Sequence, residues 1–569
     1  MGVSALRRRM PLLVVVSLLA ALLAGFDARA YDDDLDRVVT VADHKCSNGD
    51  RQEPGIQGDV PKAAQDANEA HGGYNCGLSK VGHSPLTDGE RSGGNANMAW
   101  AGDCAYISGG GSLFNAPSAR ALPAPIGGQA AEPEPEPTSG PGVAVVDVST
   151  PTQPRHVRTL RTPGATATSE TLHAVDNGEH AYLVVGQYGN HQVSDPKPMD
   201  VYDVSNCAEP KLLETFEFPV NIHNLTISGN GDYVFATQPL QVVRLLHDEL
   251  RDGDPHNGVQ YLGNLQEAMA GPPVAVGPTA DVDDHLPAEV RDEMRPRYTA
   301  HEAWPTYDGT KLYLGGQLPN FELFTIVDIE AWLQDQTQQP EIISQRQGRG
   351  HSVRTATIGG TPYVLHSEES VLGPSHGCLP EAGNPFIGPS QPWLTDISDE
   401  TNPVLVSQFG LAINHPENCP AQIDSGVRAS VHYHDVDDPE DTTFVMASMW
   451  HSGLRIFDVR DPAAPREVAY FNPGDLNARP GTGRENVQLD HAWGHVRYVK
   501  ETGHIWLATA SGGFWVLELG GRLRSALNLP QKPLVNPDGA PGTGGVELPA
   551  LPLGIRTSGA YCTIPGGVV

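Results

Sequence analysis

The middle of the chain alternates between short apolar runs and short polar segments rich in Gly, Pro, Asp and Asn. Within many runs, apolar and polar residues alternate one by one, which is typical of β-strands with one buried face. No long segment has the apolar spacing of an amphipathic helix. The 62 Gly and 49 Pro residues agree with a chain of many turns. The pattern therefore predicts an all-β protein.

Two kinds of hairpin repeat along the chain. The first has an apolar strand, Asp followed by Val or Ile, a Pro-containing turn and a second strand; it occupies residues 142–160, 198–216, 392–409 and 453–471, with a longer version at 323–345. Asp and Pro are common in tight turns. The second kind begins with histidine and occupies residues 223–237, 301–316, 351–367 and 495–509.

One hairpin of each kind makes a four-stranded blade of a propeller. Hairpins at residues 97–110 and starting near residues 170, 223, 301, 351, 432 and 495 predict seven blades. Six or eight blades, or a two-sheet sandwich, are the alternatives. We expect an all-β, seven-bladed β-propeller over residues 94–519, with an N-terminal extension (31–93), long loop insertions (247–299 and 372–391) and a Pro/Gly-rich C-terminal tail (520–569).

Residues 1–30 have the features of a secretory signal peptide: three arginines, an apolar stretch and a final Ala-Arg-Ala. An uncleaved membrane anchor is the alternative, but the apolar stretch is short for a span. No later stretch predicts a transmembrane span. We therefore expect a secreted or periplasmic protein, located outside the cytoplasm.

The net charge limits the possible partners of the protein, and the cysteines indicate disulfides. Asp and Glu number 69 against 37 Lys and Arg, a formal charge of −32, which argues against nucleic acid or anionic membrane as a partner. Seven cysteines in an exported chain favour disulfides. The candidate pairs by position are Cys46 with Cys76 and Cys378 with Cys419.

Histidines recur at one place in the second hairpins. His223, His301, His351 and His495 each stand eight residues before a turn glycine (Gly231, Gly309, Gly359 and Gly503). The hairpin near residue 432 lacks this glycine, but His432 stands twelve residues before Phe444, as His301 does before Tyr313. If these strands are innermost, all five imidazoles face the central channel. His434 lies two residues after His432 and would face the same side.

Five converging imidazoles predict a transition-metal site, with copper or iron first and zinc as a further choice. Glu302 and Glu170 could orient the ligands or offset the charge of the ion, and His173 competes with Glu170 for the channel position of its blade. The alternative is that these histidines hydrogen-bond to neighbouring blades. Acidic segments at residues 281–284 and 435–441 would suit calcium, although solvated turns explain them as well.

Several segments resemble known families. "VVDVSTPTQP", "IFDVRDPAAP" and "TDISDETNP" resemble the repeat of LVIVD-repeat proteins, which are bacterial extracellular propellers. The channel histidines are also similar to those of the selenium-binding protein and methanethiol oxidase family, which implies copper-dependent oxidation of a small thiol. The cysteine-rich early motif of that family is not matched, since "GNANMAWAGDCAYI" contains only Cys104. Carotenoid-cleaving oxygenases, which hold iron by four axial histidines, resemble the predicted ring, but their other motifs are absent.

Two functions remain open from the sequence. The first is a metal-dependent oxidase or oxygenase acting on a small substrate, with the ion held among the five histidines. The second is a non-catalytic extracellular propeller that binds a protein or glycan partner at the cell surface through its loops. Propeller folds support both classes of function.

Overall fold

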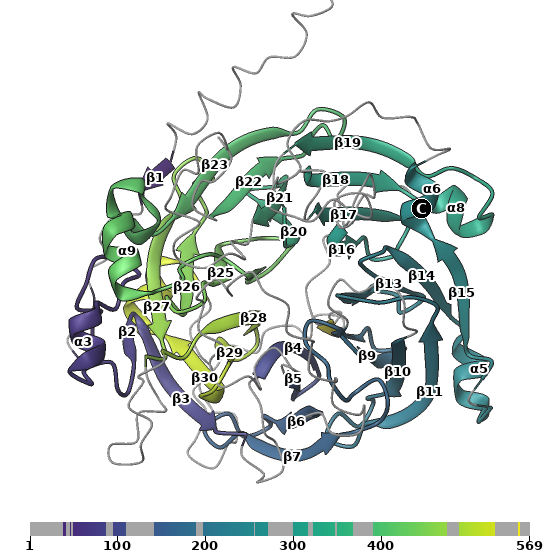
Figure 1. Ribbon diagram of the computed structural model, residues 1–569, viewed down its shortest axis with the longest axis horizontal. Helices are drawn as coiled ribbons and strands as arrows, with labels where there is room; N and C mark the ends of the chain where they lie inside the picture. The colour runs from purple at the N-terminus through teal and green to yellow at the C-terminus, as the bar shows by residue number, and fades with distance from the viewer. Residues whose placement is uncertain are drawn as a thin grey trace, which may run out of the picture.

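Seven small antiparallel sheets form a ring in the computed structural model (Figure 1). The structure describes residues 38–40, 46, 49–86, 95–109, 142–188, 197–254, 256–270, 300–316, 322–347, 350–367, 391–474, 489–529 and 556–557. The predicted all-β, seven-bladed propeller is confirmed. The predicted signal peptide lies outside the described residues.

Each sheet has four propeller strands, which follow one another from the innermost strand outward. The first blade has β4 (Asn95–Ala101), β5 (Cys104–Gly109), β6 (Val143–Asp147) and β7 (Arg155–Leu160). The second has β8 (Leu172–Asp176), β9 (Ala181–Gly186), β10 (Lys197–Asp203) and β11 (Lys211–Phe218). The third has β12 (Leu225–Ile227), β13 (Tyr233–Ala236), β14 (Gln241–Leu245) and β15 (Val259–Asn264). The fourth has β16 (Ala300–Pro305), β17 (Lys311–Gly316), β18 (Glu322–Asp328) and β19 (Glu341–Gln347).

The ring continues in the same way to its closure. The fifth blade has β20 (Val353–Ile358), β21 (Thr361–Ser367), β22 (Pro392–Asp396) and β23 (Val404–Gly410). The sixth has β24 (Tyr433–Val436), β25 (Phe444–Ser448), β26 (Leu454–Asp458) and β27 (Arg466–Asn472). The seventh has β28 (Ala492–Val499), β29 (His504–Thr509), β30 (Gly513–Leu519) and, as its outermost strand, β3 (Leu78–Ser84). A short β31 (Arg556–Thr557) pairs with β8.

The N-terminal segment belongs to these sheets. β3 pairs with β30 and so completes the last blade with the start of the chain, which joins the two ends of the ring. β2 (Tyr74–Cys76) adds to the outer edge of the sixth blade, and β1 (Val38–Thr40) pairs with β23 in parallel. Residues 31–93, expected as an extension ahead of the propeller, therefore supply strands to three blades.

Short helices lie between or outside the blades. They are α3 (Lys62–Asp66), α5 (His247–Asp252), α6 (Leu265–Ala270), α8 (Glu330–Gln334), α9 (Cys419–Ser425) and α10 (Gly521–Ala526), with 3-10 turns η2 (Ala412–Asn414) and η3 (Pro416–Asn418). The expected insertion at residues 247–299 includes the outer strand β15, because the third blade lacks the Asp and Pro turn that precedes β7, β11, β19, β23 and β27. None of the described helices is long and apolar enough to span a membrane.

The repeated aspartates have a local structural role. Each carboxylate accepts a hydrogen bond from the backbone N–H two residues later, as from Ser149 to Asp147 (3.0 Å) and from Ser398 to Asp396 (2.7 Å). Such Asx turns stabilise the change of direction after the third strand. The apolar residues of the strands pack mainly between neighbouring blades, so the core is divided around the ring.

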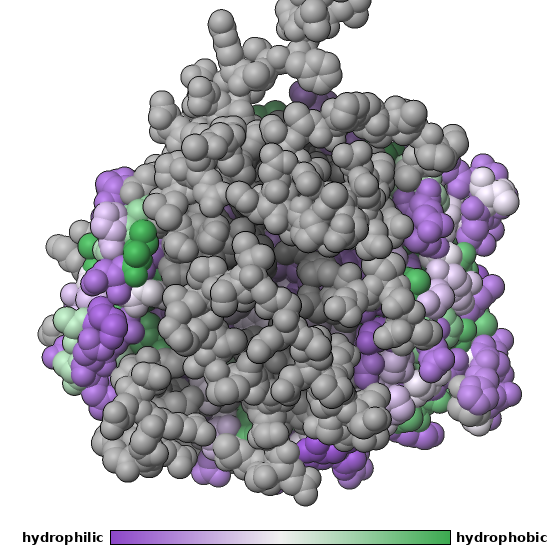
Figure 2. Space-filling view, in the orientation of Figure 1, coloured by the Kyte–Doolittle hydropathy of each residue, from purple (hydrophilic) through white to green (hydrophobic). Residues whose placement is uncertain are grey.

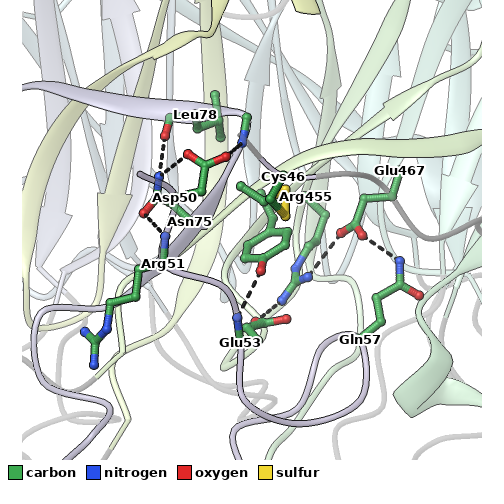
Figure 3. The surroundings of a disulfide bond; sticks show 12 residues. Cys46, Asp50, Arg51, Glu53, Gln57, Asn75, Leu78, Arg455 and Glu467 are labelled. Carbon is green, nitrogen blue, oxygen red and sulfur yellow. Dashed lines mark hydrogen bonds and ion pairs between the residues drawn. A yellow bond between two sulfur atoms is a disulfide. The ribbon is translucent and has the colours of Figure 1, made fainter. Parts of the chain in front are cut away.

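The N-terminal segment is fastened to the sixth blade by covalent and ionic contacts (Figure 3). Cys46 and Cys76 form a disulfide. The fully buried Arg455 of β26 pairs with Glu53 and, at 3.1 Å, with Glu467. Gln57 also donates to Glu467, at 2.5 Å. The disulfide ties Cys46 to β2, and the polar contacts tie Glu53 to β26 and Gln57 to β27.

The other cysteines that the structure describes also form disulfides. Cys104 and Cys207 form a disulfide that was not predicted and that joins the first two blades. Cys419 is disulfide-bonded. Because Cys378 lies outside the described residues, its pairing with Cys419 stays a prediction.

The outer rim is mainly hydrophilic where described residues are visible, with separate small hydrophobic areas (Figure 2). The exposed large hydrophobic residues lie on different blades and loops; they include Val157, Leu212, Tyr261, Val404 and Ile423. Scattered residues of this kind are normal on a protein surface.

Candidate metal centre

Five buried side chains from five consecutive blades meet near the axis: Glu170, His223, His301, His351 and His432. His301 lies in β16, and the other four immediately or closely precede the innermost strands β8, β12, β20 and β24. Among the innermost strands, the labelled β4, β16, β20 and β28 lie around the centre of the ring (Figure 1). The structure therefore brings together four of the five predicted histidines and adds a carboxylate from the second blade.

A backbone bulge stands at this position in the third and fifth blades. The N–H of His223 donates to the carbonyl of Thr237 (2.9 Å), and the N–H of Thr237 donates to the carbonyl of Asn224 (3.0 Å). His351, Ser352 and Ser367 repeat the arrangement. In each of these blades, two residues of the inner segment thus lie opposite one residue of the next strand. This bulge changes the direction in which the side chains point, as bulges commonly do near functional sites.

The nitrogen and oxygen atoms of the cluster lie close together. Nε2 of His223 is 2.9 Å from Nε2 of His301. Oε2 of Glu170 is 3.3 Å from Nε2 of His301 and 4.0 Å from Nε2 of His223, and Oε1 is 3.6 Å from Nε2 of His432. The ring of His351 lies 3.6 Å from that of His301 and 4.6 Å from that of His432, centroid to centroid.

Backbone carbonyls fix the orientation of two imidazoles. Nδ1 of His351 is 3.0 Å from the carbonyl oxygen of His432, and Nδ1 of His432 is 2.6 Å from the carbonyl oxygen of Trp493. A carbonyl only accepts, so Nδ1 carries the hydrogen and Nε2 keeps its lone pair. This is the tautomer that a metal ion requires from Nε2, and such outer hydrogen bonds are usual around metal-binding histidines.

Tyr433 holds the carboxylate of Glu170 in place. Its hydroxyl donates to Oε2 of Glu170 (2.6 Å) and accepts from the side-chain amide of Asn224 (2.7 Å). Burial, followed by the nearby Glu170, raises the pKa of Tyr433 well above its ordinary value, so the phenol keeps the proton that it donates. Glu170 therefore has a fixed orientation toward the histidines.

A buried charge network lies beside the cluster. Arg354 pairs with Glu302 (2.8 Å) and Asp435 (3.3 Å), and its guanidinium stacks 3.7 Å from the ring centre of Trp304. Burial alone would raise the pKa of Asp435, but His495 and Arg354 outweigh it and hold that pKa below its ordinary value. Burial would likewise lower the pKa of Arg354, but the two carboxylates raise it. Both groups are therefore charged.

His495 lies in this network and outside the cluster of four histidines. Nδ1 of His495 is 3.3 Å from Oδ2 of Asp435, and Nε2 is 3.6 Å from Oε1 of Glu302. Its ring lies 4.2 Å from that of Tyr433, centroid to centroid, and is tilted by 46° to it. The spacing to the turn glycine instead predicts a position equivalent to that of His301.

The hairpin loops explain the shift of His495. The loops at 229–232 and 307–310 have their glycine in third place, whereas the loop at 500–503 has Gly503 in fourth place. Counting back from the glycine therefore ends one residue too close to the turn in the seventh blade. Gly494 occupies the equivalent position, and a Cβ there would lie 2.6 Å from the carbonyl oxygen of Ala96. The seventh blade has no room for a side chain at this point.

The other predicted residues lie around the cluster. His434 is fully buried, and burial lowers its pKa to about 3. The hydroxyl of Ser352 lies 3.5 Å from its Nδ1. His173 accepts from the backbone N–H of Ile227 (3.3 Å), a contact between blades, and Glu302 accepts from the N–H of Val353 (2.9 Å).

The acidic segments considered for calcium have other partners where the structure describes them. Asp435 belongs to the Arg354 network, Asp437 accepts from the N–H groups of Thr443 and Phe444, and Asp438 pairs with Lys500. Residues 281–284 lie outside the described residues. These contacts are those of turns and ion pairs.

The cluster fits a transition-metal ion by its donors and its charge. Its ligand atoms form two groups of three, Glu170 with His223 and His301 and Glu170 with His351 and His432, each within 4.8 Å. A third group, Cys46 with Asp50 and Cys76, is already occupied by the disulfide. Neutral imidazoles with one carboxylate suit copper, iron and zinc.

The formal charges around the cluster also favour a cation. Glu170, Glu302 and Asp435 are buried carboxylates, and the guanidinium of Arg354 pairs with Glu302 and Asp435; the histidines are counted as neutral in this sum. Three carboxylates against one guanidinium leave a formal charge of −2. One divalent ion or two monovalent ions would neutralise it, and buried charges require such compensation.

Sequence reasoning missed Tyr433, Asn224, Arg354 and Asp435. Tyr433 follows His432 directly, so strand alternation assigned it to the opposite side. In the sixth blade the N–H of His432 donates to the carbonyl of Ser448 (2.9 Å), and Tyr433 also pairs with Ser448. This bulge removes the alternation, and the hydroxyl of Tyr433 reaches Glu170. Arg354 lies in β20, directly after Val353, and no sequence pattern marked it as a functional residue.

Comparison with known proteins assigns no family and no function to the chain. No protein-family model and no curated protein matches the chain. A hypothetical selenium-binding protein from Sulfolobus tokodaii matches at 13% identity and TM-score 0.40, over 74% of this chain and 92% of the other. Sqt1 from Chaetomium thermophilum matches at 10% identity and TM-score 0.38, over 78% and 99%. A functionally unknown protein from Desulfotomaculum acetoxidans matches at 12% identity and TM-score 0.35, over 66% and 84%.

Proposed function

We propose that this propeller is an exported metalloprotein that works as an oxidase or oxygenase on a small substrate, with dioxygen as co-reactant. The observation that supports it is the meeting of four buried imidazoles on one buried carboxylate. Neutral imidazole nitrogens together with a carboxylate oxygen are the donors that copper, iron and zinc bind in proteins.

The chain's own residues would hold and orient the ion. His223, His301, His351 and His432 present neutral nitrogens, and Glu170 adds a negative oxygen. Carbonyl contacts at Nδ1 and the Tyr433 hydroxyl keep these groups in position before any ion binds. Copper or iron would supply electron-transfer and oxygen chemistry when bound.

Location outside the cytoplasm forms part of this proposal. The N-terminal sequence predicts a secretory signal. Two disulfides, Cys46 with Cys76 and Cys104 with Cys207, are compatible with a periplasmic or extracellular protein. A small-molecule substrate fits a site enclosed by buried side chains better than a macromolecule does.

Metal content of the purified protein tests the proposal. The protein is purified without added metal, and copper, iron and zinc are measured together with oxygen uptake in the presence of small thiols and phenols. His301→Ala removes one ligand nitrogen and should lower the metal content by at least about half. His366→Ala is the matched control, because His366 is equally buried but hydrogen-bonds to Thr395 outside the cluster. Metal content that is equal in both variants would reject the metal centre and favour a non-catalytic propeller that binds a surface partner.

A further inference from the structure

The ligand atoms around Glu170 divide into two halves. One half consists of His223 and His301, and the other of His351 and His432. Each pair forms a group of three with Glu170, which is the residue common to both. The cluster is thus two three-ligand sites that share one carboxylate.

Bond lengths limit what a single ion can reach. Metal–nitrogen and metal–oxygen bonds of about 2.0–2.2 Å place two ligands of one ion at most about 4.4 Å apart. The ligand atoms group in threes within 4.8 Å, so one ion would have to draw all five together from both halves. Two ions would each use three atoms that are already neighbours.

The carboxylate of Glu170 is placed to serve both halves. Oε2 lies nearest to His301 (3.3 Å), and Oε1 lies 3.6 Å from His432. The hydroxyl of Tyr433 binds Oε2 and so prevents the carboxylate from turning fully toward either half. A carboxylate held with one oxygen toward each pair of imidazoles is suited to bridge two ions.

We propose that the cluster is a two-metal centre bridged by Glu170. One ion binds to His223 and His301, and the other to His351 and His432. Two-metal sites in enzymes have ions about 3.5–4 Å apart, a spacing that a bridging carboxylate allows. With the histidines counted as neutral, the formal charge of −2 around the cluster would balance the +2 charge of two cuprous ions. This inference rests on the proposed metal-binding function and adds the number of ions and the role of Glu170.

The number of ions per chain tests the proposal. The full chain is stripped with a chelator, loaded with Cu(II), desalted and analysed for copper per protein. We expect two ions in the unmodified protein and one in each of the variants His223→Ala and His432→Ala, which remove a ligand from opposite halves. His366→Ala should keep two ions.

The magnetic behaviour of the loaded protein gives a second test without any variant. Two cupric ions that share a carboxylate are coupled, so the electron paramagnetic resonance signal should account for much less than the copper measured chemically. One ion per chain with its full signal, lost in both variants, would overturn the two-metal centre and leave the metal-binding function intact. No bound copper, iron or zinc would overturn both.

Discussion

Removal of the buried Arg455 cation should release the N-terminal segment from the sixth blade. The guanidinium is fully buried, lies between the carboxylates of Glu53 and Glu467, and donates from Nε to the carbonyl of Ser452 (2.7 Å). It also covers the ring of Tyr470, at 4.5 Å from its centre. Arg455→Met keeps much of the apolar volume and leaves two buried carboxylates without their cation.

The expected change in the free energy of unfolding follows from the loss of the Arg455 cation. Removing one partner of a buried ion pair costs about 3–5 kcal/mol, because the remaining charge stays buried. Arg460→Met is the matched control, since Arg460 pairs with Asp458 at 2.7 Å on the surface, where a pair contributes about 0–1 kcal/mol. A triple variant that also carries Glu53→Gln and Glu467→Gln should regain much of the stability, because it removes the unpaired charges as well.

Hydrogen exchange is the assay that locates the change. In Arg455→Met, backbone amides of residues 49–60 and β2 should exchange faster, while the inner strands keep their protection. Denaturant titration measures the free energy of unfolding of Arg455→Met and Arg460→Met. If Arg455→Met and Arg460→Met lose the same stability within about 0.5 kcal/mol, the buried charges do not fasten this segment, and the reasoning from burial is wrong.

Three further predictions concern the site, acidity and a covalent link. Tyr433→Phe removes the hydroxyl that orients the shared carboxylate, so metal affinity measured by calorimetry should fall about 10–100-fold while the thermal midpoint of the metal-free protein changes little. Burial and then Arg428 lower the pKa of His451 to about 4. The free energy of unfolding is therefore highest above pH 6.5 and falls as the pH falls toward 4, because the unfolded chain binds a proton that the folded chain does not. In His451→Asn, urea unfolding should show that the free energy of unfolding falls by about 1–2 kcal/mol less over this range. Replacing Cys46 and Cys76 together with Ser opens a loop closed across 30 residues and should cost about 3–4 kcal/mol, whereas unchanged unfolding would show that the segment is held by its other contacts.

The architecture could be predicted because it is encoded in repeated local patterns. The Asp and Pro turns and the alternating strands gave the number of blades, and the Asx contacts of Asp147 and Asp396 show the physical reason. The third blade was incompletely identified because its outer strand β15 follows a helix and lacks that turn. The closing strand β3 could not be predicted, since pairing with β30 depends on contacts between the two ends of the chain.

The candidate site could be predicted in part. His223, His301 and His351 were found by their common distance to a turn glycine, and His432 by its distance to Phe444 in the next strand. His495 departs from them because a count from Gly503 does not detect the changed place of that glycine in its loop. Glu170 and Tyr433 depend on the position of the second blade and on the bulge beside His432, neither of which leaves a periodic signal. Spacing therefore identifies which residues face the axis but not which of them meet.

Anomalous X-ray diffraction from crystals of the protein as purified tests the central claim most directly. Data collected above and below the absorption edges of copper, iron and zinc locate each of these metals and identify its element. We predict anomalous peaks on both sides of the Glu170 carboxylate, within about 2.0–2.2 Å of the Nε2 atoms of His223, His301, His351 and His432. A cluster free of anomalous density at all three edges, with the imidazoles joined only by hydrogen bonds, would contradict the assignment of this site as a metal centre.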